Sequence, residues 1–511
     1  MRSVDVLLLG ISLCLSGQAQ RADVFSMRAQ PGPYVVGLRV VDQYDRSRNF
    51  VPKVDDLGRP TTGEKSRPIQ TLVWYPAVST KREHVSVADY LALRTTETSF
   101  GSPTSPAGLD EWFIEGIPDP SALETWAIRD ATPVAHSFPI VVYAPSFSPY
   151  SWENLDLCEY LASFGYIVVA GPGMGVQRES THDIAGASAQ AQDISFLIGW
   201  AEGLPDADET AVAVVGFSWG GLSNVFAAAR DNRIGALVAL DGSMRYFPGV
   251  IQQAGDVHPE LMTVPLLFLK GRDSLEDQAQ LEANFKNAAG PNALNAWTHG
   301  DLVSVEMLDL LHPEFNSLSQ RSEHYWELDF AHRSQTDIDR ADGATGYAWV
   351  ARYTREFLDA YLKHDPSAVA FLRKSPDENE VPKHILNATF RKALPLPFDF
   401  ADFREQVGEQ GFDHISDVYT SARSKHPAFS LESDAVTAWG YRLFGEHHAA
   451  EAIAVMRLAV QIKPSSNSYS ALGEVYARTG QKANAVETYK KALAIDPGNI
   501  IAKELLAAVE K

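Results

Sequence analysis

One short motif sets a potentially reactive side chain between two glycines. Gly216-Phe217-Ser218-Trp219-Gly220 matches the pattern G-x-S-x-G, in which the serine is the nucleophile of an acyl-transfer enzyme. The motif follows the apolar run Ala211–Val215 and opens the small-residue stretch Gly221–Ala229. This strand–turn–helix setting suits a strained nucleophile turn, because a side chain in place of either glycine would strike the neighbouring strand or helix. We expect Ser218 to be a catalytic nucleophile.

A serine hydroxyl becomes an effective nucleophile when a histidine removes its proton and an acid orients that histidine. For this motif the acid and then the histidine follow the serine along the chain. His332 is the preferred base, because it lies between a predicted strand at Tyr325–Phe330 and a predicted helix at 344–363. His312 is the rival, and its place in the middle of a connection favours an ordinary loop histidine.

Two aspartates compete for the role of the acid. Asp241 ends the apolar run Leu237–Leu240, and Asp273 follows the run that ends at Leu269. Both runs predict strands whose ends face the same side of a parallel sheet as Ser218. Either aspartate could instead cap a helix or pair with a neighbour such as Arg272, so both stay open on these grounds.

The elements around these residues follow an alternating pattern. From Tyr34 to about His364, short β-branched apolar runs alternate with helical stretches, which predicts a mostly parallel sheet with crossover helices. Eight strands in this order predict an α/β-hydrolase-like catalytic domain over 31–365. Strands are expected at Tyr34–Val41, Gln70–Trp74, Ile140–Ala144, Tyr166–Ala170, Ala211–Val215, Ala236–Leu240, Pro265–Leu269 and Tyr325–Phe330, and helices near 151–164, 182–202, 220–230, 274–288 and 344–363.

Three further regions depart from this alternation. Residues 81–137 form a Pro- and Thr-rich insertion that resembles a cap, or else a plain surface excursion. Residues 366–400 hold five prolines and predict a linker. Residues 401–511 are Ala- and Glu-rich and predict a helical domain, in which segments near 433–465 and 466–499 match at a fixed offset. The second segment resembles a tetratricopeptide repeat. Because two or three such units bury little core by themselves, we expect either a preceding helical pair within 401–430 or packing of the repeats onto the catalytic domain.

Composition limits the compartment and the partners. Apolar residues make up 45% and charged residues 21%, as in soluble globular proteins, and the net charge of −21 argues against nucleic acid or anionic lipid as the main partner. Cys14 and Cys158 are the two cysteines, too few for a disulfide framework or a cysteine-based zinc site. Residues 1–19 resemble a signal peptide, which predicts a periplasmic or secreted protein. No later segment predicts a membrane span.

Several motifs occur together along the stretch from Gly32 to Lys363: Pro31-Gly32-Pro33-Tyr34 with Val36-Gly37, Trp74-Tyr75-Pro76-Ala77, the serine motif, Leu240-Asp241, and His332 five residues before Asp337. With them this stretch resembles the platelet-activating-factor acetylhydrolase branch of the α/β-hydrolases, close to the dienelactone-hydrolase-like enzymes. In the acetylhydrolase branch the acid follows the sixth strand, which implies Asp241; in the other branch it follows the seventh, which implies Asp273. We favour Asp241.

An acyl-transfer site also needs N–H donors for the oxyanion. Trp219, the residue after the nucleophile, offers one amide. The second comes from the loop after the third strand, Ala144-Pro145-Ser146-Phe147, where the family usually has Ser-His-Gly. Alignment with the family implies the amide of Phe147, with Ser146 as the alternative.

Together these residues predict an exported serine esterase that cleaves small acyl esters and needs no metal or organic cofactor. The repeats predict a protein or peptide partner. An alternative is a protein-binding scaffold with a vestigial hydrolase domain, and a further one is a hydrolase of lactones, polyesters or amides. An intact serine, acid, histidine and glycine-flanked turn argues against the scaffold, because no structural need calls for all of them.

Overall fold

The computed structural model describes residues 25–79, 81–100, 109–147, 150–177, 180–272, 292–327 and 339–511. The chain divides into two compact units, residues 1–395 and 396–511. The expected signal peptide lies outside the described residues. Among the described residues, no helix is both long and apolar enough to cross a membrane.

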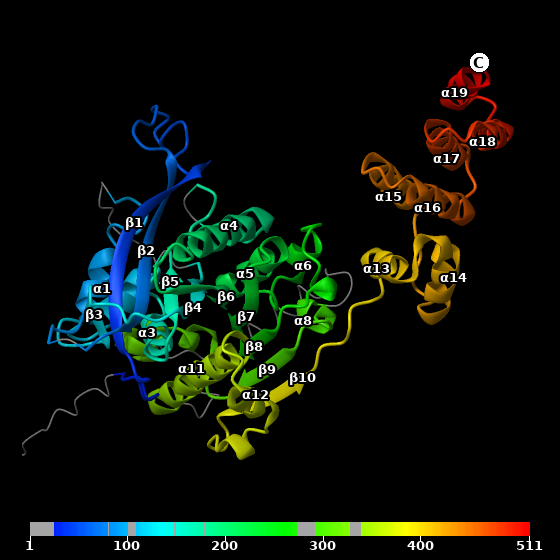
Figure 1. Ribbon diagram of the computed structural model, residues 1–511. Helices are drawn as coiled ribbons and strands as arrows, with labels where there is room; N and C mark the ends of the chain where they lie inside the picture. The colour runs from blue at the N-terminus through cyan, green and yellow to red at the C-terminus, as the bar shows by residue number, and fades with distance from the viewer. Residues whose placement is uncertain are drawn as a thin grey trace, which may run out of the picture. The chain divides into compact units, whose positions relative to one another are not determined.

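The first unit is built on a ten-stranded sheet (Figure 1). Its spatial order is β10-β9-β8-β7-β6-β4-β5-β2-β1-β3. The strands from β5 through β4, β6, β7 and β8 to β9 pair in parallel, whereas β2 pairs antiparallel with both β1 and β5, and β10 pairs antiparallel with β9. The strands are β1 (Val35–Asn49), β2 (Ser66–Ala77), β3 (Ala127–Arg129), β4 (Phe138–Ala144), β5 (Ile167–Ala170), β6 (Ala207–Phe217), β7 (Ile234–Leu240), β8 (Leu266–Lys270), β9 (Leu302–Met307) and β10 (Leu386–Arg391).

Helices cover both faces of this sheet (Figure 1). One apolar core joins one face to α3 (Leu155–Ser163) and α11 (Arg340–Leu362). A second core joins the other face to α4 (Ile184–Ala201) and α5 (Trp219–Arg230). This is the α/β-hydrolase-like architecture predicted from the alternating pattern. Shorter helices are α1 (Val87–Leu93), α2 (Leu109–Glu115), α6 (Pro248–Gln252), η1 (Pro259–Leu261), α8 (Ala293–Ala296), η2 (His312–Phe315), α9 (Ser317–Arg321), α10 (Glu323–Glu327), α12 (Pro366–Arg373) and η4 (Asp377–Asn379).

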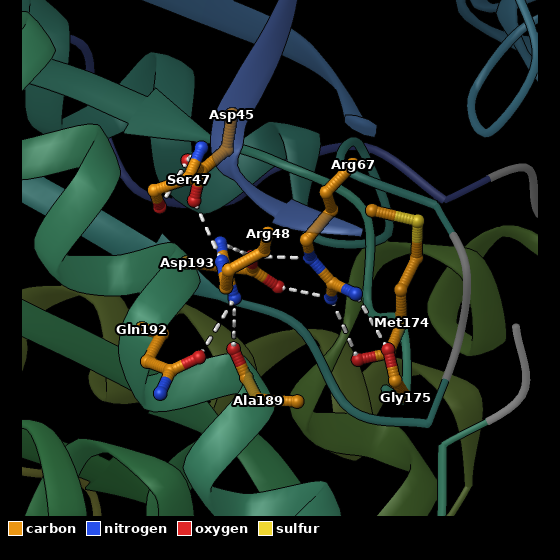
Figure 2. A network of polar contacts seen from close by, with 9 residues as sticks. All are labelled: Asp45, Ser47, Arg48, Arg67, Met174, Gly175, Ala189, Gln192 and Asp193. Atoms are coloured by element: carbon orange, nitrogen blue, oxygen red, sulfur yellow. Dashed lines mark hydrogen bonds and ion pairs between the residues drawn. The ribbon is translucent and has the colours of Figure 1, made fainter. Parts of the chain in front are cut away.

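A buried ion-pair network ties α4 to the sheet (Figure 2). Arg67 in β2 donates through Nε to Asp193 Oδ1 on α4 at 2.6 Å, and Arg48 in β1 reaches the same oxygen at 2.6 Å. The Arg67 guanidinium also donates to the backbone carbonyls of Met174 and Gly175, in the loop after β5, at 3.0 and 2.6 Å. Because these groups are largely buried, the pairing fixes the helix and this loop relative to the sheet.

Seven of the eight predicted strands are present, and the prediction of the eighth, at Tyr325–Phe330, is wrong. Residues Glu323–Glu327 form helix α10, so the predicted strand at Tyr325–Phe330 does not start there. The parallel strand after β8 is instead β9, Leu302–Met307. In β9 the polar Ser304 and Glu306 are half-buried between buried valines and a methionine, so the segment lacks the continuous apolar run by which the other strands were recognised. The predicted helix at 274–288 lies outside the described residues.

The predicted linker over 366–400 is also corrected. Residues 366–373 form α12, and Asp365 is its N-cap. Pro366 occupies the first helical position, where proline is favoured. Residues 386–391 form β10, which closes the sheet edge against β9. Four of the five prolines therefore lie inside the first unit, and the boundary between the units follows Pro395.

The inserted residues 81–137 contribute α1, α2 and the edge strand β3, which pairs parallel with β1. Tyr90 of α1 accepts a hydrogen bond from Trp74 Nε1 at 2.8 Å and donates to Glu159 of α3 at 2.6 Å. The insertion is thus packed against α3 and the sheet edge.

The second unit is helical throughout its regular structure. The pair expected within 401–430 is α13 (Phe400–Gln410) and α14 (Ile415–Lys425), joined by η5 (Phe412–His414). Two further pairs follow, α15 (Ser433–Gly445) with α16 (Ala449–Ile462) and α17 (Ser466–Arg478) with α18 (Lys482–Ile495), before α19 (Ile500–Glu510). A Cβ on Gly473 would lie 2.7 Å from the Tyr489 ring, so glycine is what lets α17 and α18 approach.

Candidate active site

Ser218 lies in a sharp turn between β6 and α5. Its φ of 51° and ψ of −114° are unusual for a residue with a side chain, and Ser218 is held by hydrogen bonds from its N–H to Leu240 O and from Ser243 N to its own carbonyl. A Cβ on Gly216 would lie 2.3 Å from the backbone of Gly220, and one on Gly220 would lie 2.0 Å from Ala144 O. The two glycines of the motif are therefore needed for close backbone packing, as the sequence predicts.

A chain of hydrogen bonds connects Ser218 to a histidine and an aspartate. His312 Nε2 lies 2.9 Å from Ser218 Oγ, and His312 Nδ1 lies 2.6 Å from Asp241 Oδ2. Ser218 directly follows β6, Asp241 directly follows the adjacent β7, and His312 opens η2 after β9. The side chain of Asp241 is 1% exposed and that of His312 is 32% exposed. The histidine is thus positioned between a buried acid and the serine, with an edge open to solvent.

The surroundings of Asp241 keep it ionised. Burial alone would raise its pKa, but the hydrogen bond and charge of His312, the charge of Arg245 and the amide of Gly271 together hold the pKa below its ordinary value. Arg245 Nη1 lies 3.5 Å from Asp241 Oδ1, and Gly271 N donates to the same oxygen at 3.3 Å. An ionised carboxylate here can orient the imidazole and stabilise its protonated form.

The histidine in this position is not the one that the sequence favours. His312, expected to be an ordinary loop histidine, makes both hydrogen bonds, whereas His332 and Asp273 lie outside the described residues. The preference for His332 depended on the predicted strand at Tyr325–Phe330, which is wrong. The apolar–polar alternation of Val303-Ser304-Val305-Glu306-Met307 would have identified β9, and His312 comes soon after that strand.

The two expected oxyanion donors belong to the start of α5 and to the loop after β4. Trp219 is the first residue of α5, where an amide has no partner within the helix. Phe147 belongs to the loop after β4, and its ring stacks on the Trp219 ring at 5.0 Å between centroids. The alternative, Ser146, donates its amide to Glu153 Oε1 at 2.7 Å and its hydroxyl to Glu153 Oε2 at 2.8 Å. The Ser146 amide is therefore occupied, which leaves Phe147 as the better candidate.

Aromatic rings gather beside these amides, a feature that sequence reasoning missed. The His182 ring lies 4.0 Å from Phe147, 5.5 Å from Trp219 and 5.1 Å from Phe247, measured between centroids. Burial lowers the pKa of His182, so it is neutral at pH 7. Among the described residues, no group of three or more His, Cys, Asp or Glu side chains is arranged to hold a metal ion.

Comparison with known proteins identifies relatives of each unit. Residues 121–367 match the family model of X-Pro dipeptidyl-peptidases (S15 family), and residues 466–499 match the tetratricopeptide repeat model. The Hsp70-Hsp90 organizing protein of Triticum aestivum is 33% identical over 104 residues, which cover 20% of this chain and 17% of that protein. A ferulic acid esterase from Streptomyces cinnamoneus has a similar solved structure, with a TM-score of 0.49 and 21% identity over 72% of this chain and 99% of that one.

The matched segment 121–367 includes Ser218, Asp241 and His312. The second of the predicted repeats coincides with the tetratricopeptide match. The chain thus combines a first unit of α/β-hydrolase-like fold with a helical second unit that contains a tetratricopeptide repeat.

Proposed function

We propose that this protein hydrolyses small acyl carboxylic esters through an acyl-enzyme on Ser218, with His312 as the base and Asp241 as the acid that orients it. The observation that carries the proposal is the chain of hydrogen bonds from Ser218 Oγ through His312 to the buried Asp241, at 2.9 and 2.6 Å. In this arrangement the aspartate orients the imidazole, and the imidazole can take the proton of the serine that attacks the substrate.

In the proposed reaction, His312 Nε2 takes the proton of Ser218 as Oγ attacks the ester carbonyl carbon. The amides of Trp219 and Phe147 donate hydrogen bonds to the resulting oxyanion. His312 then gives the proton to the leaving alcohol, and the acyl group stays on Ser218. Water attacks this acyl-enzyme with His312 again as the base, which releases the acid and restores the serine.

Two observations bear on which kind of bond is cleaved, and they point to different substrates. The sequence resemblance to platelet-activating-factor acetylhydrolases supports small acyl esters. The match to X-Pro dipeptidyl-peptidases favours a second candidate, cleavage of a peptide bond after proline. Both reactions use the same serine chemistry and differ in the leaving group, an alcohol or an amine.

The test is a comparison of substrates. The protein is assayed on p-nitrophenyl esters from acetate to decanoate and on Xaa-Pro p-nitroanilides, with and without a serine-directed phosphonate. We expect the highest kcat/KM on short-chain esters and its loss after phosphonate treatment. Turnover of the anilides alone would support the peptidase instead.

The first variant tests the nucleophile. Ser218→Ala should lower kcat on an acetyl ester by about 10⁴-fold or more and abolish phosphonate labelling, because the three hydrogen-bonded side chains act as a unit. The matched control is Ser223→Ala, which removes a buried hydroxyl from the same helix and should leave kcat unchanged. Labelling that persists in Ser218→Ala would place the nucleophile elsewhere and refute this mechanism.

A further inference from the structure

We propose that Glu153 is a positioning residue for the oxyanion donor, and that it holds the loop after β4 in the conformation that presents the Phe147 amide. This inference rests on the proposed function of Ser218 as a nucleophile. Glu153 lies just before α3, and it is 2% exposed. The carboxylate of Glu153 accepts hydrogen bonds from Tyr143 and Ser146, so its effect on the reaction passes through the loop.

The Glu153 carboxylate accepts three hydrogen bonds from β4 and the loop after it. Oε1 accepts from the Ser146 amide at 2.7 Å and from the Tyr143 hydroxyl at 2.9 Å, and Oε2 accepts from the Ser146 hydroxyl at 2.8 Å. A buried carboxylate that loses its donors is costly, since no water replaces them. The loop is thereby held in place, because any movement of Ser146 would break two of these bonds at once.

A second side chain holds the same loop from the other face of the sheet. Gln190 of α4 donates through Nε2 to Pro145 O at 2.7 Å. Three residues further along this helix, Asp193 is fixed by Arg67 and Arg48 (Figure 2). The Pro145 carbonyl and the Ser146 amide are therefore both occupied, and the next amide in the chain is that of Phe147.

The turn that carries Glu153 also contacts the segment that carries His312. Leu318 N donates to Glu153 O at 3.2 Å, and Asn154 Nδ2 donates to Phe315 O at 3.0 Å. Phe315 ends η2, the short helix that His312 opens. The turn at Glu153 and Asn154 thus connects the loop after β4 with η2, the helix that begins with His312. This fits a role in holding the oxyanion donor and the base at a fixed distance from each other.

This arrangement also explains how the loop after β4 can differ in sequence from the family that the chain resembles. The resembled family usually has Ser-His-Gly in this loop, whereas this chain has Ala144-Pro145-Ser146. Here a proline of fixed φ and a serine with both donors bound to Glu153 hold the backbone. The loop is therefore positioned by side chains outside it.

The experiment compares Glu153→Leu and Glu153→Gln in the full-length protein. Each variant is assayed for kcat and KM on p-nitrophenyl acetate and for inhibition by an alkyl trifluoromethyl ketone, which forms a tetrahedral adduct with the serine. For Glu153→Leu we expect kcat and affinity for the ketone to fall together by about 10²–10³-fold, the effect of one lost oxyanion donor, with KM nearly unchanged. Glu153→Gln keeps an acceptor and should stay within about tenfold of wild type.

The matched control is Glu159→Leu, which removes another buried carboxylate from the same region. Glu159 binds Tyr90 and the Trp126 amide and does not contact the loop after β4. The Glu159→Leu variant should have a lower melting temperature, with kcat and ketone affinity as in wild type. If Glu153→Leu does not fold, Ser146→Ala replaces it, with an expected parallel loss of about 3- to 10-fold in kcat and ketone affinity.

Two results would overturn the inference. One is a Glu153→Leu protein with lowered melting temperature but unchanged kcat and ketone affinity. The other is a rise in KM without a loss of ketone affinity, which would assign Glu153 to substrate binding. Failure of the proposed function is a separate outcome, because then Ser218→Ala would itself retain activity.

Discussion

At the scale of single residues, the site depends on which histidine faces Ser218. The imidazole of His312 reaches both Ser218 Oγ and Asp241 Oδ2 with hydrogen-bond geometry. An imidazole can remove the serine proton only from a position of this kind. The two histidines that the sequence offered as bases are therefore expected to differ sharply in their importance.

We predict that His312→Gln lowers kcat on an acetyl ester by about 10⁴-fold or more, whereas His332→Gln stays within a few-fold of wild type. Phosphonate labelling of Ser218 should be lost in the first variant only. Steady-state rates and labelling of the two purified proteins decide this, with circular dichroism as the control for folding. The reverse ranking would restore His332 as the base.

The sequence predicted the serine and the acid more readily than the histidine for a physical reason. Ser218 and Asp241 each directly follow a buried apolar run, Ala211–Phe217 in β6 and Ala236–Leu240 in β7, and such runs are recognised from composition alone. His312 follows β9, the last parallel strand before the antiparallel edge strand β10, where polar and apolar residues alternate. Glu153 and Gln190 could not be found in this way, because their roles depend on contacts across the fold.

At the scale of elements, buried carboxylates join the insertion to α3 and to the turn before it. Glu97, which follows α1, accepts hydrogen bonds from the amide and hydroxyl of Ser151, and Glu159 of α3 accepts from Tyr90 of α1. Burial raises the pKa of Glu97 to about 8 and that of Glu159 to about 7. Both groups therefore keep a proton in the folded protein at pH values where the unfolded chain has released it.

We predict that this protein becomes less stable as the pH rises from about 4.5 to 8. In this window the folded state binds more protons than the unfolded state, so the free energy of unfolding falls with pH. Glu97→Gln, which stays neutral, should flatten this dependence and stabilise the protein at pH 9 by about 2 kcal/mol. Urea unfolding at pH 5, 7 and 9 measures the effect.

The control for this series is Glu124→Gln, which changes an exposed glutamate of the same insertion. Its dependence on pH should match that of wild type. If wild type and Glu97→Gln lost stability in parallel between pH 5 and 9, Glu97 would not be protonated in the folded protein.

At the scale of the whole molecule, the chemistry and the repeats belong to different units. Ser218, Asp241, His312 and Glu153 all lie in residues 1–395. The two apolar cores of that unit draw on residues between Phe25 and Phe390, and the cores of the second unit draw on residues between Phe398 and Val509. Each unit has apolar cores of its own, which is the packing that it needs to fold by itself.

The repeats suggest a protein partner, since tetratricopeptide units stack into extended surfaces suited to binding. Within a helix pair, a small residue packs against an aromatic ring, as Gly473 of α17 does against Tyr489 of α18. None of the residues proposed for catalysis lies among them. This separation bears on the alternative of a binding scaffold with a vestigial hydrolase domain, because the two activities can be measured apart.

We predict that a chain ending at Pro395 keeps kcat on p-nitrophenyl acetate within about twofold of the full-length protein. The expected reason is that the hydrogen-bonded residues around Ser218 and both apolar cores of the first unit remain complete. The matched control is the full-length Ser218→Ala protein, which should keep its repeats folded and lose the activity. A truncated chain that is folded by circular dichroism but inactive would show that the repeats complete the active unit. Inactivity of the full-length protein on every substrate tested would instead favour the scaffold.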